Sequence, residues 1–170
     1  DLAGSSCGDP VVTGEEMLVE VNGAQLYVRA IGSGDPLVIV HGGPGMSHDY
    51  FLPHMEELKK NYRLIFYDQR VSGRSSAEVP DSTVNLDNWL EDLDGVRKLY
   101  KIEKMNLLAH SWGGLVAMHY AVRYPGRLKS LVLVNPAPTT VEESTAGNTT
   151  VMKRFTQEQL ERRQEMNRSR

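Results

Sequence analysis

The sequence predicts an α/β fold with a largely parallel sheet. Three short apolar runs, at 37–40, 64–67 and 131–134, have the length and composition of strands buried on both faces. Between the second and third runs, apolar residues over 86–99 recur at steps of three and four, which is typical of an amphipathic helix. Strands that alternate with helices favour a parallel sheet joined by right-handed crossovers.

Two alternating runs, 17–21 and 25–29, flank Asn22-Gly23, which is the strongest short-range signal for a β-hairpin. We therefore expect a hairpin before the first parallel strand. The other expected elements, in chain order, are a turn at 32–36, a short helix within 52–62, a loop at 68–81, a strand at 105–108 and a helix at 115–124.

Length and composition are those of one domain with a substantial core. The chain has 170 residues, of which 40% are hydrophobic and 24% charged. Its net charge of −3 gives no general attraction to nucleic acid or to an anionic membrane. The apolar runs are far too short to span a bilayer. These properties favour a cytoplasmic protein.

The first 14 residues are rich in Gly, Ser, Asp and Pro, and we interpret residues 1–14 as a flexible tail. Cys7 is the single cysteine, so an internal disulfide is impossible. Its neighbours are small and polar. An alternative interpretation is therefore the end of a bacterial lipoprotein signal, with Cys7 lipidated and the protein periplasmic.

The chain changes character after residue 138. Residues 139–150 are polar, and residues 152–170 hold few large apolar side chains. Thr156 followed by Gln159 has the spacing of a capping box at a helix N-terminus. We interpret 15–140 as the N-terminal part of the core and 141–170 as the start of a helical cap; the alternative for the latter is a solvated terminal helix.

Ser111 has the sequence setting of a nucleophile. It follows an apolar run, precedes a helical pattern, and has Ala109 and Gly113 two positions before and after it. A sharp strand-to-helix turn requires small residues at these positions, because the two backbones approach closely there. Glycine is usual at the first of them, so Ala109 is a mild departure. We predict that Ser111 is the catalytic nucleophile of a hydrolase.

A serine nucleophile needs donors for the oxyanion that forms. One is expected to be the backbone N–H of Trp112, directly after the nucleophile. The second is expected from the glycine-rich loop 41–45, and we favour Gly43. The remaining small residues of that loop are predicted to line the substrate pocket: Gly42, Pro44 and Gly45. Taken alone, the loop is equally compatible with a tight turn.

Three motifs in order, at 41–45, 68–75 and 110–114, resemble the signatures of the prolyl iminopeptidase family. The resemblance covers about residues 15–138, the N-terminal portion of such an enzyme. It implies an α/β-hydrolase fold and a serine aminopeptidase that cleaves N-terminal proline, or another small residue, from peptides through an acyl-enzyme. An esterase or amidase of the same superfamily is the alternative.

The second motif departs from the family at Val71, where the resemblance implies glycine. A β-branched residue does not comfortably adopt φ > 0, so we expect either an ordinary torsion at Val71 or a rearranged loop. Asp68 and Arg70 are interpreted as structural, pinning the loop by hydrogen bonds and charge pairing.

The acid and base of a catalytic triad are not encoded after Ser111. In this fold they follow the nucleophile in the order acid, then histidine. No aspartate follows Ser111, and the single later histidine, His119, falls eight residues into the next helix. We therefore expect the isolated chain to be inactive, with Asp and His supplied by a missing C-terminal segment or a second polypeptide.

The other histidines are weaker candidates for a base. His41 is expected to shape its loop and His110 to point away from Ser111. His48 and His54 flank the site region and are alternative candidates for the base. No metal-ligand or nucleotide-binding motif is present, so no metal and no cofactor are expected.

Two functional classes therefore remain open. One is a serine peptidase acting on a peptide, or on a small amide or ester. The other is a catalytically silent binding module that keeps the turn and a pocket. In either case we expect the strand 131–134 to present an unpaired apolar edge that promotes association.

Overall fold

The computed structural model describes residues 16–75 and 78–140, together with nine positions further on: 142, 145, 146, 149, 153, 156, 157, 159 and 161. The predicted tail over 1–14 and Cys7 lie outside the described residues. The chain divides into two compact units, 1–136 and 137–170, and each is described by itself.

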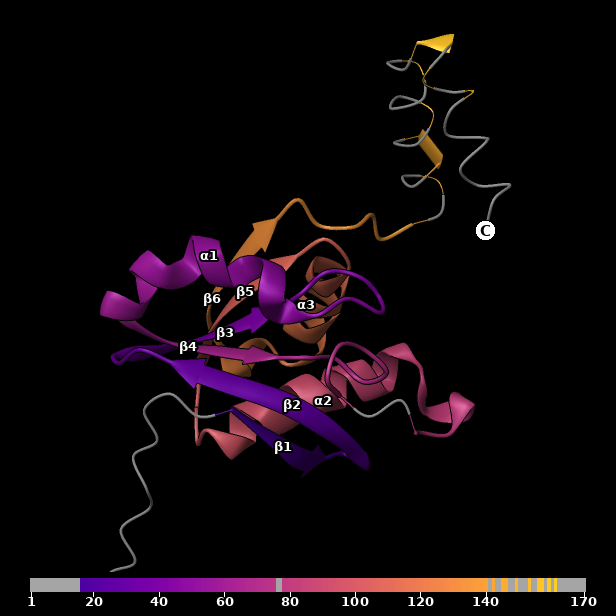
Figure 1. The fold of residues 1–170 in the computed structure, drawn as a ribbon. Coiled ribbons are helices and arrows are strands. Elements are labelled where there is room, and N and C mark those ends of the chain that lie inside the picture. The colour runs from indigo at the N-terminus through magenta and orange to yellow at the C-terminus, as the bar shows by residue number, and fades with distance from the viewer. Residues whose placement is uncertain are drawn as a thin grey trace, which may run out of the picture. The chain divides into compact units, whose positions relative to one another are not determined.

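Within the described part of the first unit, six strands form one mixed sheet in the order β1-β2-β4-β3-β5-β6. The pairs β1–β2 and β2–β4 are antiparallel, and β4, β3, β5 and β6 run parallel. Figure 1 shows the chain passing from the β1–β2 hairpin into this parallel part. The α/β-hydrolase fold with an N-terminal hairpin is confirmed. The strands are β1 Glu16–Val21, β2 Ala24–Ile31, β3 Asp35–Val40, β4 Tyr62–Tyr67, β5 Met105–His110 and β6 Leu128–Val134.

The hairpin turn has the backbone that its sequence predicts. Val21 pairs with Ala24, so the loop is the two residues Asn22 and Gly23. Their φ values are 48° and 72°, and two positive torsions are characteristic of a type I′ turn. This turn matches the twist of the strands and fixes their register.

Helices lie on both faces of the sheet, and the buried side chains of the strands separate into two clusters. On one face, α2 (Leu86–Leu99) and α3 (Trp112–Arg123) pack on alternate residues of the strands, among them Val38 and Leu107. On the other face, Ile39 and Leu108 pack beneath the short helical segment between β3 and β4. That segment, predicted as one short helix within 52–62, consists of η1 His48–Phe51, α1 Leu52–Met55 and η2 Glu56–Lys60.

β6 corrects one prediction. The run 131–134 was expected to be buried on both faces, but Val132, Leu133 and Val134 are 47%, 37% and 41% exposed. The physical reason is position, because β6 pairs with β5 on one side and ends the sheet of described strands on the other. An apolar composition indicates a strand, but it does not indicate whether other elements pack over the side chains of that strand.

In the second unit, the capping box predicted at Thr156 is present. The Thr156 side chain accepts a hydrogen bond from the Gln159 N–H at 3.3 Å, and the Gln159 side chain accepts one from the Thr156 N–H at 2.9 Å. Helical backbone is found at Gln157, Gln159 and Glu161. Across the described residues of both units, no helix has the length and apolarity needed to cross a membrane.

Candidate active site

Ser111 lies at the sharp turn between β5 and α3. Its torsions are φ 51° and ψ −119°, which an L-residue rarely adopts. A Cβ on Gly113 would come within 2.5 Å of the His41 carbonyl and 2.6 Å of the Val40 carbonyl, so α3 can begin here only with glycine at that position. The Ser111 N–H donates to the Val134 carbonyl at 3.2 Å, which ties the turn to the end of β6.

The glycine-rich loop 41–45 lies directly against this turn. A Cβ on Gly42 would be 3.1 Å from Ser111 Cβ. Within the described part of the chain, neither the Gly43 N–H nor the Trp112 N–H donates a hydrogen bond to a protein group. The structure therefore places loop 41–45, which contains Gly43, beside the turn that contains Ser111 and Trp112.

The three residues predicted to line the substrate pocket differ in their burial. Gly42 is buried, whereas Pro44 and Gly45 are exposed, and the Gly43–Pro44 peptide is cis. The Gly45 N–H donates to the Ser72 hydroxyl at 3.0 Å. Thus the exposed end of loop 41–45 is held by the loop that follows β4.

Tyr50, which was not among the predicted site residues, links the loop to the turn. Its hydroxyl accepts a hydrogen bond from the Gly42 N–H at 2.7 Å and lies 2.8 Å from His110 Nδ1. Burial raises the pKa of Tyr50, so the hydroxyl stays protonated. No sequence signal marks a contact across 60 positions, which is why sequence analysis missed it.

His41 shapes its loop, as expected. Its ring is buried, and its Nε2 accepts a hydrogen bond from the Gln69 N–H at 2.9 Å. The Gln69 side chain donates to the His41 carbonyl at 2.7 Å. Burial lowers the pKa of His41, so the ring is neutral and the proton that Nε2 lacks resides on Nδ1, which faces the Gly42 carbonyl.

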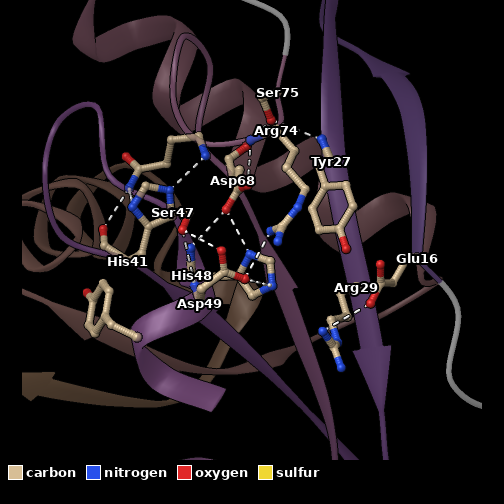
Figure 2. A network of polar contacts seen from close by, with 12 residues as sticks. Glu16, Tyr27, Arg29, His41, Ser47, His48, Asp49, Asp68, Arg74 and Ser75 are labelled. Carbon is tan, nitrogen blue, oxygen red and sulfur yellow. Dashed lines mark hydrogen bonds and ion pairs between the residues drawn. The ribbon is translucent and has the colours of Figure 1, made fainter. Parts of the chain in front are cut away.

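Asp68 is the centre of the polar network in Figure 2. Its Oδ1 accepts from the His48 N–H at 2.9 Å and lies 2.8 Å from His48 Nδ1, and its Oδ2 accepts from the Arg74 N–H at 2.8 Å. Burial alone would raise the pKa of Asp68, but the hydrogen bonds from His48 and Arg74 outweigh it and lower that pKa. Asp68 therefore has the structural role expected of it.

Arg70 also pins the same loop. It makes two hydrogen bonds to the Asp92 carboxylate on α2, 2.7 Å from Nε and 2.6 Å from Nη2, with both side chains buried. It donates further to the Thr83 carbonyl at 3.0 Å. This paired arrangement fixes the loop after β4 to α2.

Val71 contradicts the first of the two expectations made for it, an ordinary torsion. Its φ is 54°, in the region that a β-branched residue disfavours. In the same loop, the Ser72 N–H donates to the Gln69 carbonyl at 3.0 Å. The surrounding hydrogen bonds hold a β-branched residue in a conformation that it disfavours on its own.

The histidines do not supply a base to Ser111 in this arrangement. His48 is bound to Asp68, and its other ring nitrogen, Nε2, is buried with no hydrogen bond to the described residues. His54 and His119 are exposed, and His110 faces Tyr50. The suggestion that His48 or His54 approaches Ser111 as a base therefore finds no support in these contacts.

Comparisons with known proteins agree with this geometry. A sequence profile described as alpha/beta hydrolase fold matches residues 35–167. A proline iminopeptidase of Saccharolobus solfataricus is 37% identical over 136 residues, which are 76% of this chain and 44% of the relative. One of Lactobacillus helveticus is 40% identical over 120 residues, 65% of this chain and 40% of the relative.

Solved structures show the same similarity. A proline iminopeptidase-related protein from Thermus thermophilus superposes with a TM-score of 0.68 at 31% identity, covering 74% of this chain and 45% of that one. A Vigna radiata epoxide hydrolase variant superposes with a TM-score of 0.66 at 25% identity, covering 76% and 41%. The chain thus spans less than half the length of the relatives that it matches.

Proposed function

We propose, because this chain belongs to the alpha/beta hydrolase fold family and is related to proline iminopeptidases, that it carries the nucleophile and the oxyanion hole of a serine aminopeptidase. In this proposal Ser111 is the nucleophile, and the Gly43 and Trp112 amides are the oxyanion donors. The general base and its acid come from polypeptide outside these 170 residues.

The observation that carries the proposal is the strained backbone conformation of Ser111, together with the position of loop 41–45 beside it. A serine held at φ 51° and ψ −119° is strained, and such strain persists where the surrounding structure imposes it. The loop 41–45 reaches this same turn, with the position of a Gly42 Cβ 3.1 Å from Ser111 Cβ. A serine near two backbone amides that have no acceptor among the described residues is the arrangement that acyl transfer requires.

The reaction that follows is acyl transfer through a covalent intermediate. Ser111 Oγ attacks the carbonyl carbon of the first residue of the substrate and loses its proton to the general base. The carbonyl oxygen takes up the electron pair and is stabilised by the Gly43 and Trp112 N–H groups. When the carbonyl re-forms, the C–N bond breaks and the leaving amine takes the proton; water then hydrolyses the acyl-enzyme.

For the substrate we propose N-terminal proline, or another small residue, on a peptide. The support is the similarity to relatives that are named proline iminopeptidases. An ester or a simple amide is the alternative within the same fold, because the same nucleophile and donors serve each of these carbonyl compounds.

The test is labelling of Ser111 with a fluorophosphonate probe. We expect slow labelling of the isolated chain and rapid labelling once it is mixed with the segment of the Saccharolobus solfataricus relative that this chain does not match. In that mixture proline β-naphthylamide should be hydrolysed faster than alanine β-naphthylamide. Ser111→Ala is the matched control and should show neither reaction.

A silent binding module is the second candidate, favoured by the absence of a histidine contacting Ser111 in the described part of the chain. It predicts no labelling of Ser111 with or without the added segment. If the mixture forms a complex by light scattering but Ser111 stays unlabelled, the peptidase proposal is overturned.

A further inference from the structure

Tyr50 links loop 41–45 to the end of β5, the two segments that flank the proposed nucleophile. It lies in η1, and its hydroxyl reaches both the loop 41–45 and the end of β5. The described contacts of the hydroxyl are with Gly42 N, at 2.7 Å, and with His110 Nδ1, at 2.8 Å. His110 directly precedes Ser111, so this bridge ends one residue from the proposed nucleophile.

The direction of the hydrogen bond to Gly42 follows from the groups involved. A backbone N–H can only donate, so the Tyr50 oxygen accepts from Gly42. Burial raises the pKa of Tyr50, so the hydroxyl keeps its proton. The same hydroxyl forms a second hydrogen bond with His110 Nδ1, 2.8 Å away.

The bridge also determines which amide of the loop remains available. Gly42 and Gly43 are adjacent, and either N–H is a conceivable oxyanion donor at a glycine-rich loop. The Gly42 N–H is already used by Tyr50, whereas the Gly43 N–H has no acceptor within the described part of the chain. The hydroxyl of Tyr50 thus separates two otherwise equivalent donors.

We propose that Tyr50 is a positioning residue, which binds the Gly42 amide, holds the loop 41–45 against the nucleophile turn and leaves the Gly43 amide as the oxyanion donor. This inference rests on the proposed function. It extends that function by assigning a residue that acts through Gly42 and His110 rather than by touching the substrate.

The aromatic ring of Tyr50 is held independently of its hydroxyl. The ring stacks on Phe51 with centroids 4.4 Å apart and packs edge-on against His110 at 5.5 Å. Phenylalanine preserves these ring contacts, so Tyr50→Phe removes the hydroxyl bridge and little else. Tyr62→Phe is a matched control, since Tyr62 is the first residue of β4 and its hydroxyl forms no hydrogen bond with loop 41–45 or His110 among the described residues.

The first readout does not depend on catalysis. Amide hydrogen exchange by NMR should show slow exchange at Gly42 and faster exchange at Gly43 in the 170-residue chain. In Tyr50→Phe, Gly42 exchange should accelerate at least tenfold, while the Leu107 amide in β5 and both amides in Tyr62→Phe keep their rates. The ring ¹⁵N shift of His110 Nδ1 should also change, because Nδ1 loses its hydrogen bond to the Tyr50 hydroxyl.

The second readout connects the bridge to Ser111. In the labelling mixture used to test the proposed function, Tyr50→Phe should reduce the maximal rate of fluorophosphonate labelling about tenfold with little change in its half-saturation concentration. A purely structural residue would instead lower the folded fraction and leave the rate per folded molecule unchanged.

The outcomes separate the two proposals. Unchanged Gly42 exchange in Tyr50→Phe overturns the role of Tyr50, and so does accelerated exchange with an unchanged labelling rate. If wild-type Ser111 is never labelled, the proposed function is overturned, while accelerated Gly42 exchange and a changed His110 Nδ1 shift in Tyr50→Phe still support the bridge.

Discussion

Ser111 combines a small polar side chain with a backbone conformation that disfavours any side chain. Its φ of 51° and ψ of −119° lie outside the regions that L-residues populate. Torsions of this kind cost about 1–3 kcal/mol and are retained where neighbouring contacts impose them. Here Gly113 and the Ser111 N–H bond to Val134 supply that constraint. The nucleophile turn is therefore built at the expense of stability.

We predict that Ser111→Gly is more stable than Ser111→Ala by about 1 kcal/mol, because glycine relieves the strain while part of the gain is lost to the entropy of its unfolded chain. Both variants lack the hydroxyl, so their difference isolates the backbone. Urea unfolding followed by circular dichroism measures it. Equal midpoints for the two variants would show that the turn is not strained.

Val71, like Ser111, has a disfavoured backbone conformation that its neighbours impose. Valine at φ 54° is held by a loop whose other members are strongly bonded, through Asp68 to His48 and through Arg70 to Asp92. No property of the single residue predicts this, because its own preference is for extended backbone. The error made from sequence was to weigh the residue against its local preference alone.

At the scale of elements, a buried carboxylate joins α2 to α3. Asp94 on α2 is fully buried and accepts hydrogen bonds at 2.8 Å from the Arg97 side chain and from the Tyr120 hydroxyl on α3. Lys98 and Arg127 also lie 2.8 Å from its oxygens. A charge with this many donors is compensated despite its burial.

The pKa of Asp94 makes this junction sensitive to acid. Burial alone would raise the pKa, but the hydrogen bonds from Arg97, Lys98 and Tyr120 outweigh it and place the pKa far below its usual value. A carboxyl whose folded pKa is depressed stabilises the protein at pH values above the unfolded pKa, which is about 4. That contribution is lost as the pH falls below about 4.

We therefore predict that Asp94→Asn lowers the free energy of unfolding at pH 7 by about 2 kcal/mol, since charge-assisted hydrogen bonds are replaced by weaker ones. Between pH 5 and pH 3 the stability of the variant should fall less steeply than that of the wild-type chain. Asp87→Asn is the control, because Asp87 is exposed and pairs with Arg123 at the surface. Parallel pH profiles for Asp94→Asn and wild type would contradict the prediction.

The elements that sequence analysis predicted correctly are those with a local cause. The hairpin follows from Asn22-Gly23, α2 from the repeat over 86–99, and the loop 41–45 from its glycines. The bridge from Gly42 through Tyr50 to His110 has no such cause, because its ends are 8 and 60 positions from Tyr50. Periodicity identifies a face to be buried, but it does not identify which distant side chain meets it.

At the scale of the whole first unit, the same limit explains the error at β6. Four consecutive apolar residues at 131–134 indicate a strand, and the strand exists. Whether its outer side is covered depends on what else pairs with it, and in the described sheet β6 is the last strand. Within the described part of the chain, Val132 and its neighbours thus form an apolar edge strand with no further strand on its outer side.

We predict that this edge drives self-association of the 170-residue chain. An exposed apolar edge strand offers a template for pairing with another strand, and a charged side chain on it opposes such pairing. Val132→Lys should therefore shift the weight-average mass at micromolar concentration toward the monomer, as measured by light scattering with size-exclusion chromatography. Val122→Lys is the matched control, because Val122 is 84% exposed on α3 rather than on the sheet edge. If the wild-type chain is monomeric throughout this range, or if both lysine variants reduce association equally, the β6 edge is not the cause.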